Sequence, residues 1–244
     1  MKQLRYWLLI ACAVITVVMA QAQAQAVIVF PDPYLTEEER PDGRLFLPAP
    51  PDWTDMVFAN DIYFYQWGKQ QRQTPQGDKA KQDDPLELFE AFSEAFGLVI
   101  SPERTPEIDR LAGGAARDAH LANKVAKDYF KRPRPFVYFH EPSISPERDE
   151  EQSKGYSYPS GHASRGWVYA MTLALVNPDS TYALLNRAQE YAIGRVICGH
   201  HYKSDIDTSL MLAATIMGAL NGNERFKQQL ARARKEYARL KKNQ

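Results

Sequence analysis

The sequence predicts an all-α fold, a single compact multi-helix domain with its functional site between helices. Apolar residues recur at helical spacing in several stretches after residue 52, and no stretch shows the alternation of apolar and polar residues that indicates a strand. Proline or glycine ends most of the periodic stretches. About 220 residues follow the N-terminal segment, which is enough for one sizeable core, and no linker or internal repeat divides them.

Residues 1–24 have the layout of a secretory signal peptide. Lys2 and Arg5 precede an apolar run, and alternating Ala and Gln then offer small-x-small cleavage sites between residues 22 and 26. The run is shorter than the roughly 20 residues of a membrane-spanning helix. A retained anchor is the alternative, and the very short apolar stretch before Cys12 disfavours lipidation. We expect cleavage, a periplasmic or secreted protein, and no stable membrane association.

The remaining composition excludes some partners. Lys plus Arg total 30, as do Asp plus Glu, so we expect neither a nucleic acid polymer nor an anionic membrane as partner. Cleavage removes Cys12 and leaves Cys198, so no intrachain disulfide is possible, and Cys198 is expected to be a buried packing residue. Residues 27–51 are predicted to form an extended arm over the domain of residues 52–244, because they contain Pro31, Pro33, Pro41, Pro48, Pro50 and Pro51.

The first predicted helix starts at Asp52 and has an aromatic and apolar face made of Trp53, Met56, Val57, Tyr63, Phe64 and Trp67. We interpret this face as core, and a contact within a homo-oligomer stays open. A shorter helix is expected to open at Asp84-Pro85 and to close at Gly97, with its apolar stripe formed by Leu86, Phe89, Phe92 and Phe96.

The next helix is expected to be central, because its apolar stripe consists mostly of alanines that allow a neighbouring helix to approach closely. Thr105 is its predicted N-cap and Pro106 its first residue. It must stop near Arg132, because Pro133 and Pro135 cannot continue a helix. Residues 138–158 follow as a polar, charged loop that is long enough to be functional.

Four more helices are predicted. Ser160 is expected to cap a helix that runs from Ala163 to about Val176, and Asp179 to open one that reaches Arg195. The third starts at Ser204 or Asp205 and ends at Asn221-Gly222. The last is amphipathic and carries an apolar stripe of Phe226, Leu230, Ala233 and Tyr237.

Three segments carry side chains suited to phosphate chemistry. They are Lys127 with Arg134, then Pro159-Ser160-Gly161-His162, and then Arg195 with His201 and Asp205. A guanidinium binds an oxyanion bidentately, an imidazole carries protons near neutral pH, and a carboxylate fixes which imidazole nitrogen is protonated. A glycine at a helix start leaves room for an anion near the backbone amides. Taken singly, each segment is also explained by ordinary helix caps and surface hydrogen bonds.

Together, the three segments closely resemble the signature of the type 2 phosphatidic acid phosphatase superfamily, in order and in spacing. Within that superfamily, the RPRPF and ICG contexts and the similarity from about Leu45 to Tyr237 resemble the bacterial class A non-specific acid phosphatases. Gly194 departs from the pattern, because the family usually has Ser before the arginine. We expect this change to alter the support of Arg195 rather than to abolish activity.

The resemblance implies a role for each residue. His201 attacks phosphorus to give a phosphohistidine, Asp205 holds its other ring nitrogen, and His162 protonates the leaving group and later deprotonates water. The phosphate-binding groups that it implies are those of Lys127, Arg134, Ser160, Gly161 and Arg195. It implies no cofactor, and because no cluster in the sequence has metal-ligand spacing, we expect no metal. His200 is expected to be a bystander and His120 a structural or surface residue.

The expected activity is hydrolysis of small-molecule phosphate monoesters, with phosphotransfer to alcohols as an extension and with inorganic phosphate and vanadate as inhibitors. An acidic optimum is expected, because attack needs a neutral histidine and departure needs a protonated one. A vanadate-dependent haloperoxidase is an alternative, since those enzymes resemble this superfamily. A non-catalytic phosphate-binding helical module is a second alternative, but it would not need His162, His201 and Asp205 together.

Overall fold

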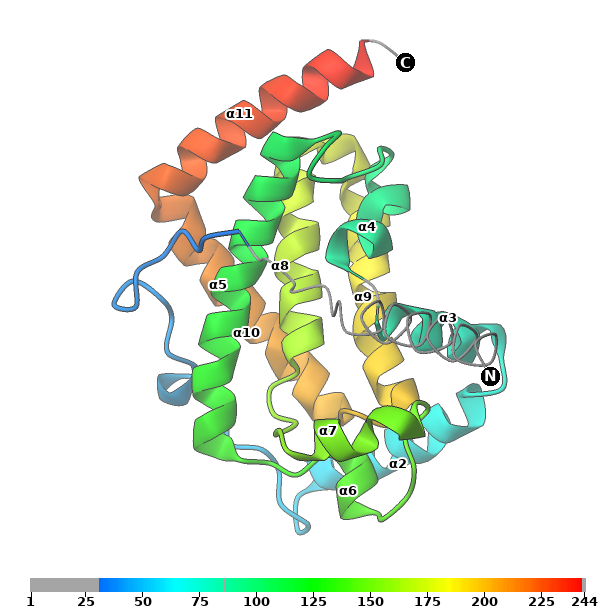
Figure 1. Cartoon of the computed structure of the whole chain (residues 1–244). Helices are drawn as coiled ribbons and strands as arrows, with labels where there is room; N and C mark the ends of the chain where they lie inside the picture. Colours follow the sequence, from blue (N-terminus) through cyan, green and yellow to red (C-terminus); the bar gives the residue numbers. More distant parts are fainter. Residues whose placement is uncertain (1–30, 86, 243–244) are drawn as a thin grey trace, which may run out of the picture. The chain divides into compact units, whose positions relative to one another are not determined.

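The computed structural model describes residues 31–85 and 87–242, so the predicted signal peptide and Leu86 lie outside the described residues. The described residues form helices, turns and irregular segments without any strand, which confirms the all-α prediction. The longer helices are α2 (Met56–Gln71), α3 (Pro75–Asp83), α4 (Leu88–Phe96), α5 (Pro106–Phe130), α8 (Gly161–Val176), α9 (Thr181–Cys198), α10 (Lys203–Gly222) and α11 (Glu224–Lys241) (Figure 1). The short ones are η1 (Gly43–Leu45), α6 (Pro135–Tyr138), η2 (Pro146–Arg148), α7 (Asp149–Ser153) and η3 (Pro178–Ser180).

Helix α8 packs against α5, α9 and α10, and its inward side chains are part of the main core. The expected alanine stripe of α5 is buried and allows α8 to approach closely; it includes Ala112, Ala115, Ala119, Ala122 and Ala126. Side chains this small leave little space between the two helix backbones, so the two helices hold each other at short range. The position of α8 in the bundle therefore follows largely from α5.

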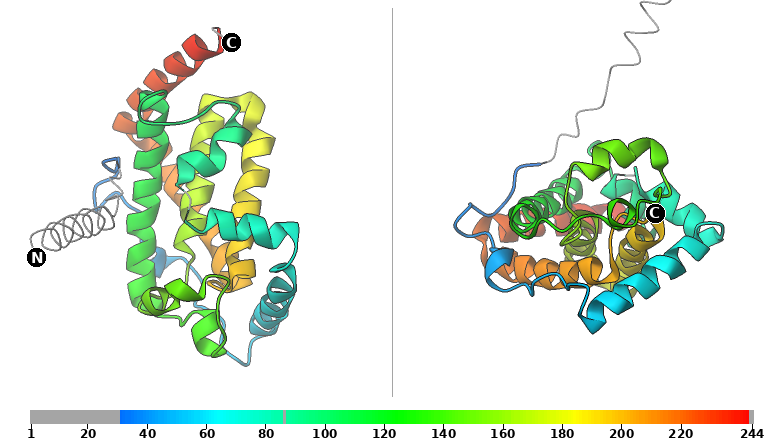
Figure 2. Two further views of the ribbon diagram at one scale, coloured as in Figure 1. Left: turned by 45° about the vertical axis from the view of Figure 1, so that its right-hand side comes forward. Right: turned by 90° about the horizontal axis from the view of Figure 1, so that it is seen from below.

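Four helix ends meet at the lower end of the bundle in Figure 1, namely the C-terminal ends of α5 and α9 and the N-terminal ends of α8 and α10. The segment that contains α6 and α7 lies at the same end in Figures 1 and 2. Helix α5 stops as expected, because Lys131 takes a left-handed conformation (φ 51°) just before Pro133. Ser160 caps α8 as expected, since its Oγ accepts from the backbone N–H of Ala163 at 3.3 Å. These boundaries bring the three predicted site segments to one place.

Residues 31–51 contain one short 3-10 helix and no α-helix. This segment is bound to α5 through Asp118, whose carboxylate accepts from the N–H groups of Tyr34 at 2.8 Å and Leu35 at 3.3 Å. Its later part is held by Tyr158, whose hydroxyl donates to the carbonyl oxygen of Pro48 at 2.6 Å. The proline-rich segment is therefore anchored to the helices by buried polar groups as well as by apolar contacts.

Helix α11 is tied to the start of α5. Glu236 accepts from the backbone N–H groups of Glu107 at 3.1 Å and Ile108 at 3.0 Å, two donors that have no partner inside their own helix. Thr105 occupies the N-cap position of α5 but makes no capping hydrogen bond, and Pro106 is the first helical residue. The carboxylate of Glu236, more than 100 residues away in the sequence, therefore caps α5 in place of the predicted N-cap Thr105.

The prediction that the aromatic and apolar face of the first helix is core is wrong for four of its six residues, namely Trp53, Met56, Val57 and Tyr63, whereas Phe64 and Trp67 pack against the core. Trp53 is 78% exposed and Tyr63 is 66% exposed, whereas Asp61 and Gly68 are buried. Helix α2 packs on α9 at Gly68, where a Cβ atom would lie only 2.8 Å from the carbonyl oxygen of Val196. The inward face of α2 carries Phe58, Asp61, Tyr65 and Gly68, so the buried aromatic residues are not those of the predicted stripe. Gly68 on this face permits the close approach to α9.

Helix α3 is absent from the prediction, because its polar sequence shows no apolar period. The helix expected to open at Asp84-Pro85 instead begins at Leu88, with Glu87 forming a capping box, and it closes at Gly97 (φ 84°) as expected. Asp84 consequently lies in the connection between two helices, where its side chain is free to reach another element. None of the helices within the described ranges is both long and apolar enough to cross a membrane.

Candidate active site

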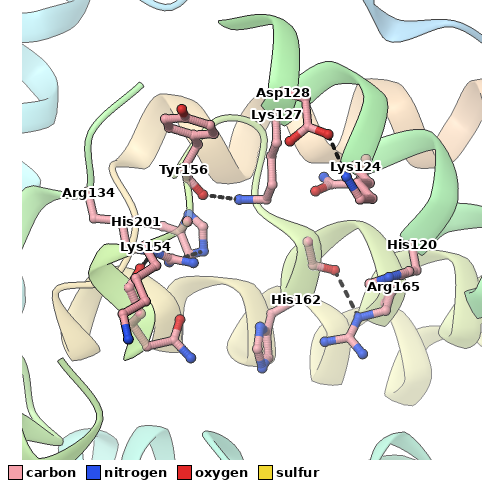
Figure 3. Close-up of a pocket in the computed structure, with 14 residues that line it drawn as sticks. His120, Lys124, Lys127, Asp128, Arg134, Lys154, Tyr156, His162, Arg165 and His201 are labelled. Carbon is pink, nitrogen blue, oxygen red and sulfur yellow. Dashed lines mark hydrogen bonds and ion pairs between the residues drawn. The ribbon is translucent and has the colours of Figure 1, made fainter. Parts of the chain in front are cut away.

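A cavity of about 390 Å³ opens where the ends of α5 and α8 meet the segment between α9 and α10 (Figure 3). Five of the predicted site residues line it, namely Lys127, Arg134, Gly161, His162 and His201. The other three lie behind its wall and are at most 2% exposed; they are Ser160, Arg195 and Asp205. The structure thus brings all three predicted segments together, with five residues facing the cavity and three supporting it.

His201 reaches the cavity through the turn that ends α9. Gly199 takes the left-handed conformation (φ 83°), and the N–H groups of His200 and His201 both donate to the carbonyl oxygen of Arg195 at 3.2 Å. A residue with a Cβ would be strained at that φ value, so the glycine of the ICG sequence permits the turn. The turn places the arginine and the two histidines on a common framework at the base of the site.

The hydrogen bonds of His201 indicate its tautomer. Arg134 Nη1 lies 3.2 Å from His201 Nε2, and a guanidinium can only donate, so Nε2 is the unprotonated nitrogen of the ring. Nδ1 then carries the proton, and it lies 3.4 Å from Asp205 Oδ2. Within the described residues Nδ1 forms no hydrogen bond, so the carboxylate is adjacent to it without being aligned. In the unliganded protein the lone pair of Nε2 therefore accepts from Arg134, and both residues line the cavity.

Asp205 is fixed by a buried network that the sequence did not indicate. Its Oδ2 accepts from the backbone N–H of Tyr202 at 2.8 Å, and its Oδ1 accepts from Arg132 Nη1 at 2.6 Å. Arg132 Nη2 donates to Asp61 Oδ2 at 2.7 Å, and Asp61 also accepts from the N–H of Ser204 at 2.8 Å. The Arg132 guanidinium lies 3.8 Å from the centre of the Tyr202 ring. The side chain of Asp205 therefore has little freedom to move.

Arg195 is held by Asp84 and His200. Its Nη1 donates to Asp84 Oδ1, and its Nη2 lies 2.6 Å from His200 Nδ1. The second carboxylate oxygen of Asp84 accepts from Arg148 Nη1 at 2.6 Å. Burial alone would raise the pKa of Asp84, but the interactions with His200 and Arg195 hold it well below its usual value. His200 is thus a direct partner of Arg195 rather than a bystander.

Two cations at the cavity wall have backbone carbonyls as partners. Lys127 Nζ donates to the carbonyl oxygen of Tyr156, and Arg134 Nε donates to that of Gln152 at 2.9 Å. Neither forms an ion pair with a carboxylate in the described part of the chain. Burial and the charge of Arg134 lower the pKa of Lys127, and burial followed by Arg195 lowers the pKa of Arg134 to about 10. An anion in the cavity would relieve this repulsion.

The cavity histidines are neutral at pH 7 in the unliganded protein. The pKa of His162 is lowered by burial and by Arg195, and that of His201 by burial and by Arg134. His120, which we expected to be structural or superficial, also lines the cavity, and burial and Arg165 lower its pKa to about 4. Bound phosphate would raise all three pKa values because it opposes the surrounding cations.

The start of α8 combines a cap with a close contact. Ser160 N donates to the carbonyl oxygen of Asp205 at 3.2 Å, which joins α8 to α10, while its Oγ caps α8. A Cβ on Gly161 would lie 3.2 Å from Asn123 Oδ1, so glycine is well suited to this crowded position beside the cavity. The expected contact of the Ser160 hydroxyl with phosphate stays a prediction.

Asp84, Cys198 and His200 form a group whose possible ligand atoms lie within 4.8 Å of one another. These atoms are already engaged or protonated. Asp84 accepts from two arginines, His200 Nδ1 lies 2.6 Å from Arg195 Nη2, and burial raises the pKa of the Cys198 thiol to about 11. A metal ion would have to displace arginine from each of the first two residues and deprotonate the third. The group is therefore poorly suited to a cation.

Comparison with known proteins gives consistent matches. Residues 111–224 match the PAP2 superfamily, and this span contains all eight predicted site residues. The chain is 37% identical over 213 residues to a non-specific acid phosphatase of Providencia stuartii, with 86% of each chain covered. It is 31% identical to a non-specific acid phosphatase of Salmonella typhimurium (84% of this chain, 83% of that one) and 30% identical to an acid phosphatase of Zymomonas mobilis (84% and 79%).

Proposed function

This chain belongs to the PAP2 superfamily and is an acid phosphatase, a phosphoric monoester hydrolase, and from that premise we propose that it acts through a phosphohistidine at His201. The observation that carries the proposal is the contact of Arg134 Nη1 with His201 Nε2 at the cavity, because it marks Nε2 as the unprotonated nitrogen of a neutral imidazole. A phosphoryl group that binds Arg134 would take over this hydrogen bond and free the Nε2 lone pair for attack. The nearby Asp205 would stabilise the positive charge that develops on the ring during attack.

The first step forms a bond between His201 Nε2 and phosphorus and breaks the bond between phosphorus and the ester oxygen. Protonated His162 gives its proton to the departing oxygen and becomes a neutral imidazole. In the second step His162 takes a proton from water, the resulting hydroxide attacks phosphorus, and the P–N bond breaks to release phosphate and free His201. An alcohol in place of water would yield a new ester, which is the basis of the phosphotransfer that we expect.

The proposed phosphate ligands are the side chains of Lys127, Arg134 and Arg195, the hydroxyl of Ser160 and the N–H of Gly161. Fixed positive charge around the transferred group stabilises the negative oxygens of the transition state. Because these cations are already held by carbonyl groups and by Asp84, little reorganisation accompanies binding. No metal or cofactor takes part in the proposed reaction.

The substrates that we propose are small phosphate monoesters, including nucleotides, sugar phosphates and aryl phosphates. The cavity of about 390 Å³ supports this range, since it accommodates a phosphoryl group with part of its leaving group and leaves the rest outside. Inorganic phosphate should inhibit as product, and vanadate should inhibit as a mimic of the five-coordinate transition state. The N-terminal sequence pattern supports a periplasmic or secreted location.

The test is hydrolysis of p-nitrophenyl phosphate at acidic pH in EDTA, with wild type, His201→Asn and the matched control His140→Asn. His140 is exposed and does not line the cavity, and asparagine tolerates its left-handed conformation (φ 54°). We expect turnover in wild type and control and none in His201→Asn, and after rapid quenching an alkali-stable phosphoenzyme in wild type and control but not in His201→Asn. Turnover that EDTA abolishes would contradict the proposal, and bromide oxidation with vanadate and peroxide would favour a haloperoxidase. Phosphate binding without either reaction would favour a binding module.

A further inference from the structure

Arg165 lies in the first turns of α8 and lines the cavity. It is three residues after His162, which places the two side chains on the same side of the helix. Its Nε donates to the carbonyl oxygen of Gly161 at 3.2 Å, and this bond fixes the guanidinium beside the cavity. In Figure 3, His162 lies between His201 on one side and Arg165 on the other, with His120 close to Arg165.

The guanidinium of Arg165 forms no ion pair with any carboxylate in residues 31–85 and 87–242. Burial lowers its pKa, as expected for a cation that is partly removed from water. Arg165 itself is only partly buried. Three fully buried arginines differ from it, since Arg132, Arg187 and Arg195 each contact a buried aspartate. Buried cations in proteins are normally paired. Arg165 shares its lack of a carboxylate partner with Arg134, the proposed phosphate ligand on the other side of the cavity. An anion in the cavity would supply the missing charge.

The position of Arg165 points to the leaving group rather than to the transferred phosphoryl group. In an in-line displacement the leaving oxygen lies opposite the attacking nitrogen, and His162 protonates that oxygen in the proposed reaction. Arg165 lies beyond His162 when viewed from His201. Its Nη atoms form no hydrogen bond with any described residue, so both are available to a group attached to the leaving oxygen.

We propose that Arg165 forms a second anion subsite, which binds a phosphate or carboxylate group carried by the leaving group of the substrate. This inference rests on the function proposed above, because it assigns the leaving-group side of the same cavity. It predicts a preference for diphosphates, bisphosphates and phosphorylated hydroxy acids over esters with neutral leaving groups. A guanidinium suits such groups because it binds a carboxylate or a phosphate through two parallel hydrogen bonds.

The kinetic test uses two substrates that differ in one group. In 3-phosphoglycerate the leaving group carries a carboxylate, and in glycerol 3-phosphate a hydroxymethyl group takes its place. We expect Arg165→Gln to lower kcat/KM for 3-phosphoglycerate by about 10- to 100-fold, the value of one charge-assisted contact, and to change that for glycerol 3-phosphate by less than about 3-fold. Arg165→Lys should recover part of the loss. Arg104→Gln, at an exposed arginine outside the cavity, is the control.

A binding measurement separates this inference from the proposed catalytic mechanism. Calorimetric titration with methylenediphosphonate and methylphosphonate, at fixed ionic strength, needs no turnover. We expect Arg165→Gln to weaken binding of the diphosphonate by about 10-fold or more and that of the monophosphonate by much less. If no variant hydrolyses any ester but this difference persists, the catalytic proposal fails and the subsite stands.

Two results would overturn the subsite. Equal losses for both substrates and both phosphonates would mean that Arg165 acts on the transferred phosphoryl group or on the structure of α8. No change with any ligand would mean that the guanidinium does not contact the leaving group. If Arg165→Gln does not fold, Arg165→Lys and Arg165→Met are judged by the same ratio between the paired ligands.

Discussion

Arg132 and Asp205 form a buried ion pair, with 2.6 Å between Arg132 Nη1 and Asp205 Oδ1, next to the proposed nucleophile. Arg132 also holds Asp61, so its removal leaves two buried carboxylates without a counter-charge. We therefore expect Arg132→Met to lower the free energy of unfolding by about 3–5 kcal/mol. Urea denaturation measures the change, with Arg239→Met at an exposed arginine as control. Equal effects of the two substitutions would show that the ion pairs contribute nothing to stability.

Asp84→Asn removes the charge that opposes Arg195 and keeps the shape of the side chain. We expect the variant to unfold at a lower temperature than wild type, because Arg195 then stays buried without a carboxylate. If Arg195 faces bound phosphate, the ligand replaces the lost charge, so phosphate should raise the Tm of Asp84→Asn more than that of wild type. Thermal melts with and without phosphate check this, with the exposed Asp179→Asn as control. Equal phosphate shifts would place Arg195 outside the anion site.

The buried His200 should make stability depend on pH. Burial lowers its pKa from 6.5 to about 4, so between these values the unfolded chain binds a proton that the folded chain does not. Keeping His200 neutral therefore costs no stability above pH 6.5. As the pH falls below this value the free energy of unfolding decreases, by on the order of 3 kcal/mol at pH 4. In urea denaturation from pH 7 to pH 4, His200→Gln should therefore lose stability less steeply than wild type. A steeper or equal slope would contradict a neutral buried His200, and His140→Gln serves as control.

Gly194, the departure from the family pattern, should tolerate a side chain. A Cβ there would lie 3.4 Å from Ala80 Cβ, which is an ordinary contact. Alanine also has a higher helix propensity than glycine. We expect Gly194→Ala to raise the free energy of unfolding by about 0.5–1 kcal/mol, and Gly194→Ser to hydrolyse p-nitrophenyl phosphate with a kcat/KM close to that of wild type. Gly68→Ala should be destabilising instead, because its Cβ would lie 2.8 Å from Val196 O. Destabilisation by Gly194→Ala would show that α9 needs glycine at this point.

Much of the helical architecture followed from the sequence, because long periodic stretches and strong helix breakers act locally. The alanine stripe of α5, the stop before Pro133 and the cap at Ser160 were all predicted. The inward face of α2 was not, because periodicity identifies an apolar stripe but does not show which neighbour will cover it. Helix α3 was missed for a related reason, since it is polar along most of its length and is held by its contact with α9.

Motifs predicted five of the residues that line the cavity, but not His120 or Arg165, and they did not indicate the groups that hold Asp205 and Arg195. Asp61 is 71 residues from Arg132 in the sequence, and Asp84 is 111 residues from Arg195, so no local spacing connects either pair. The sequence DDP before α4 was interpreted as a helix start, which is a common role for aspartate and proline.

The cap that Glu236 places on α5 also couples the first turn of that helix to the packing of α11. The N–H groups of Glu107 and Ile108 keep their acceptor only while α11 stays docked on α5. Local detachment of α11 would expose both donors to water. Their amide hydrogens should therefore exchange with solvent as often as α11 detaches, while Lys127 lies at the other end of the same helix.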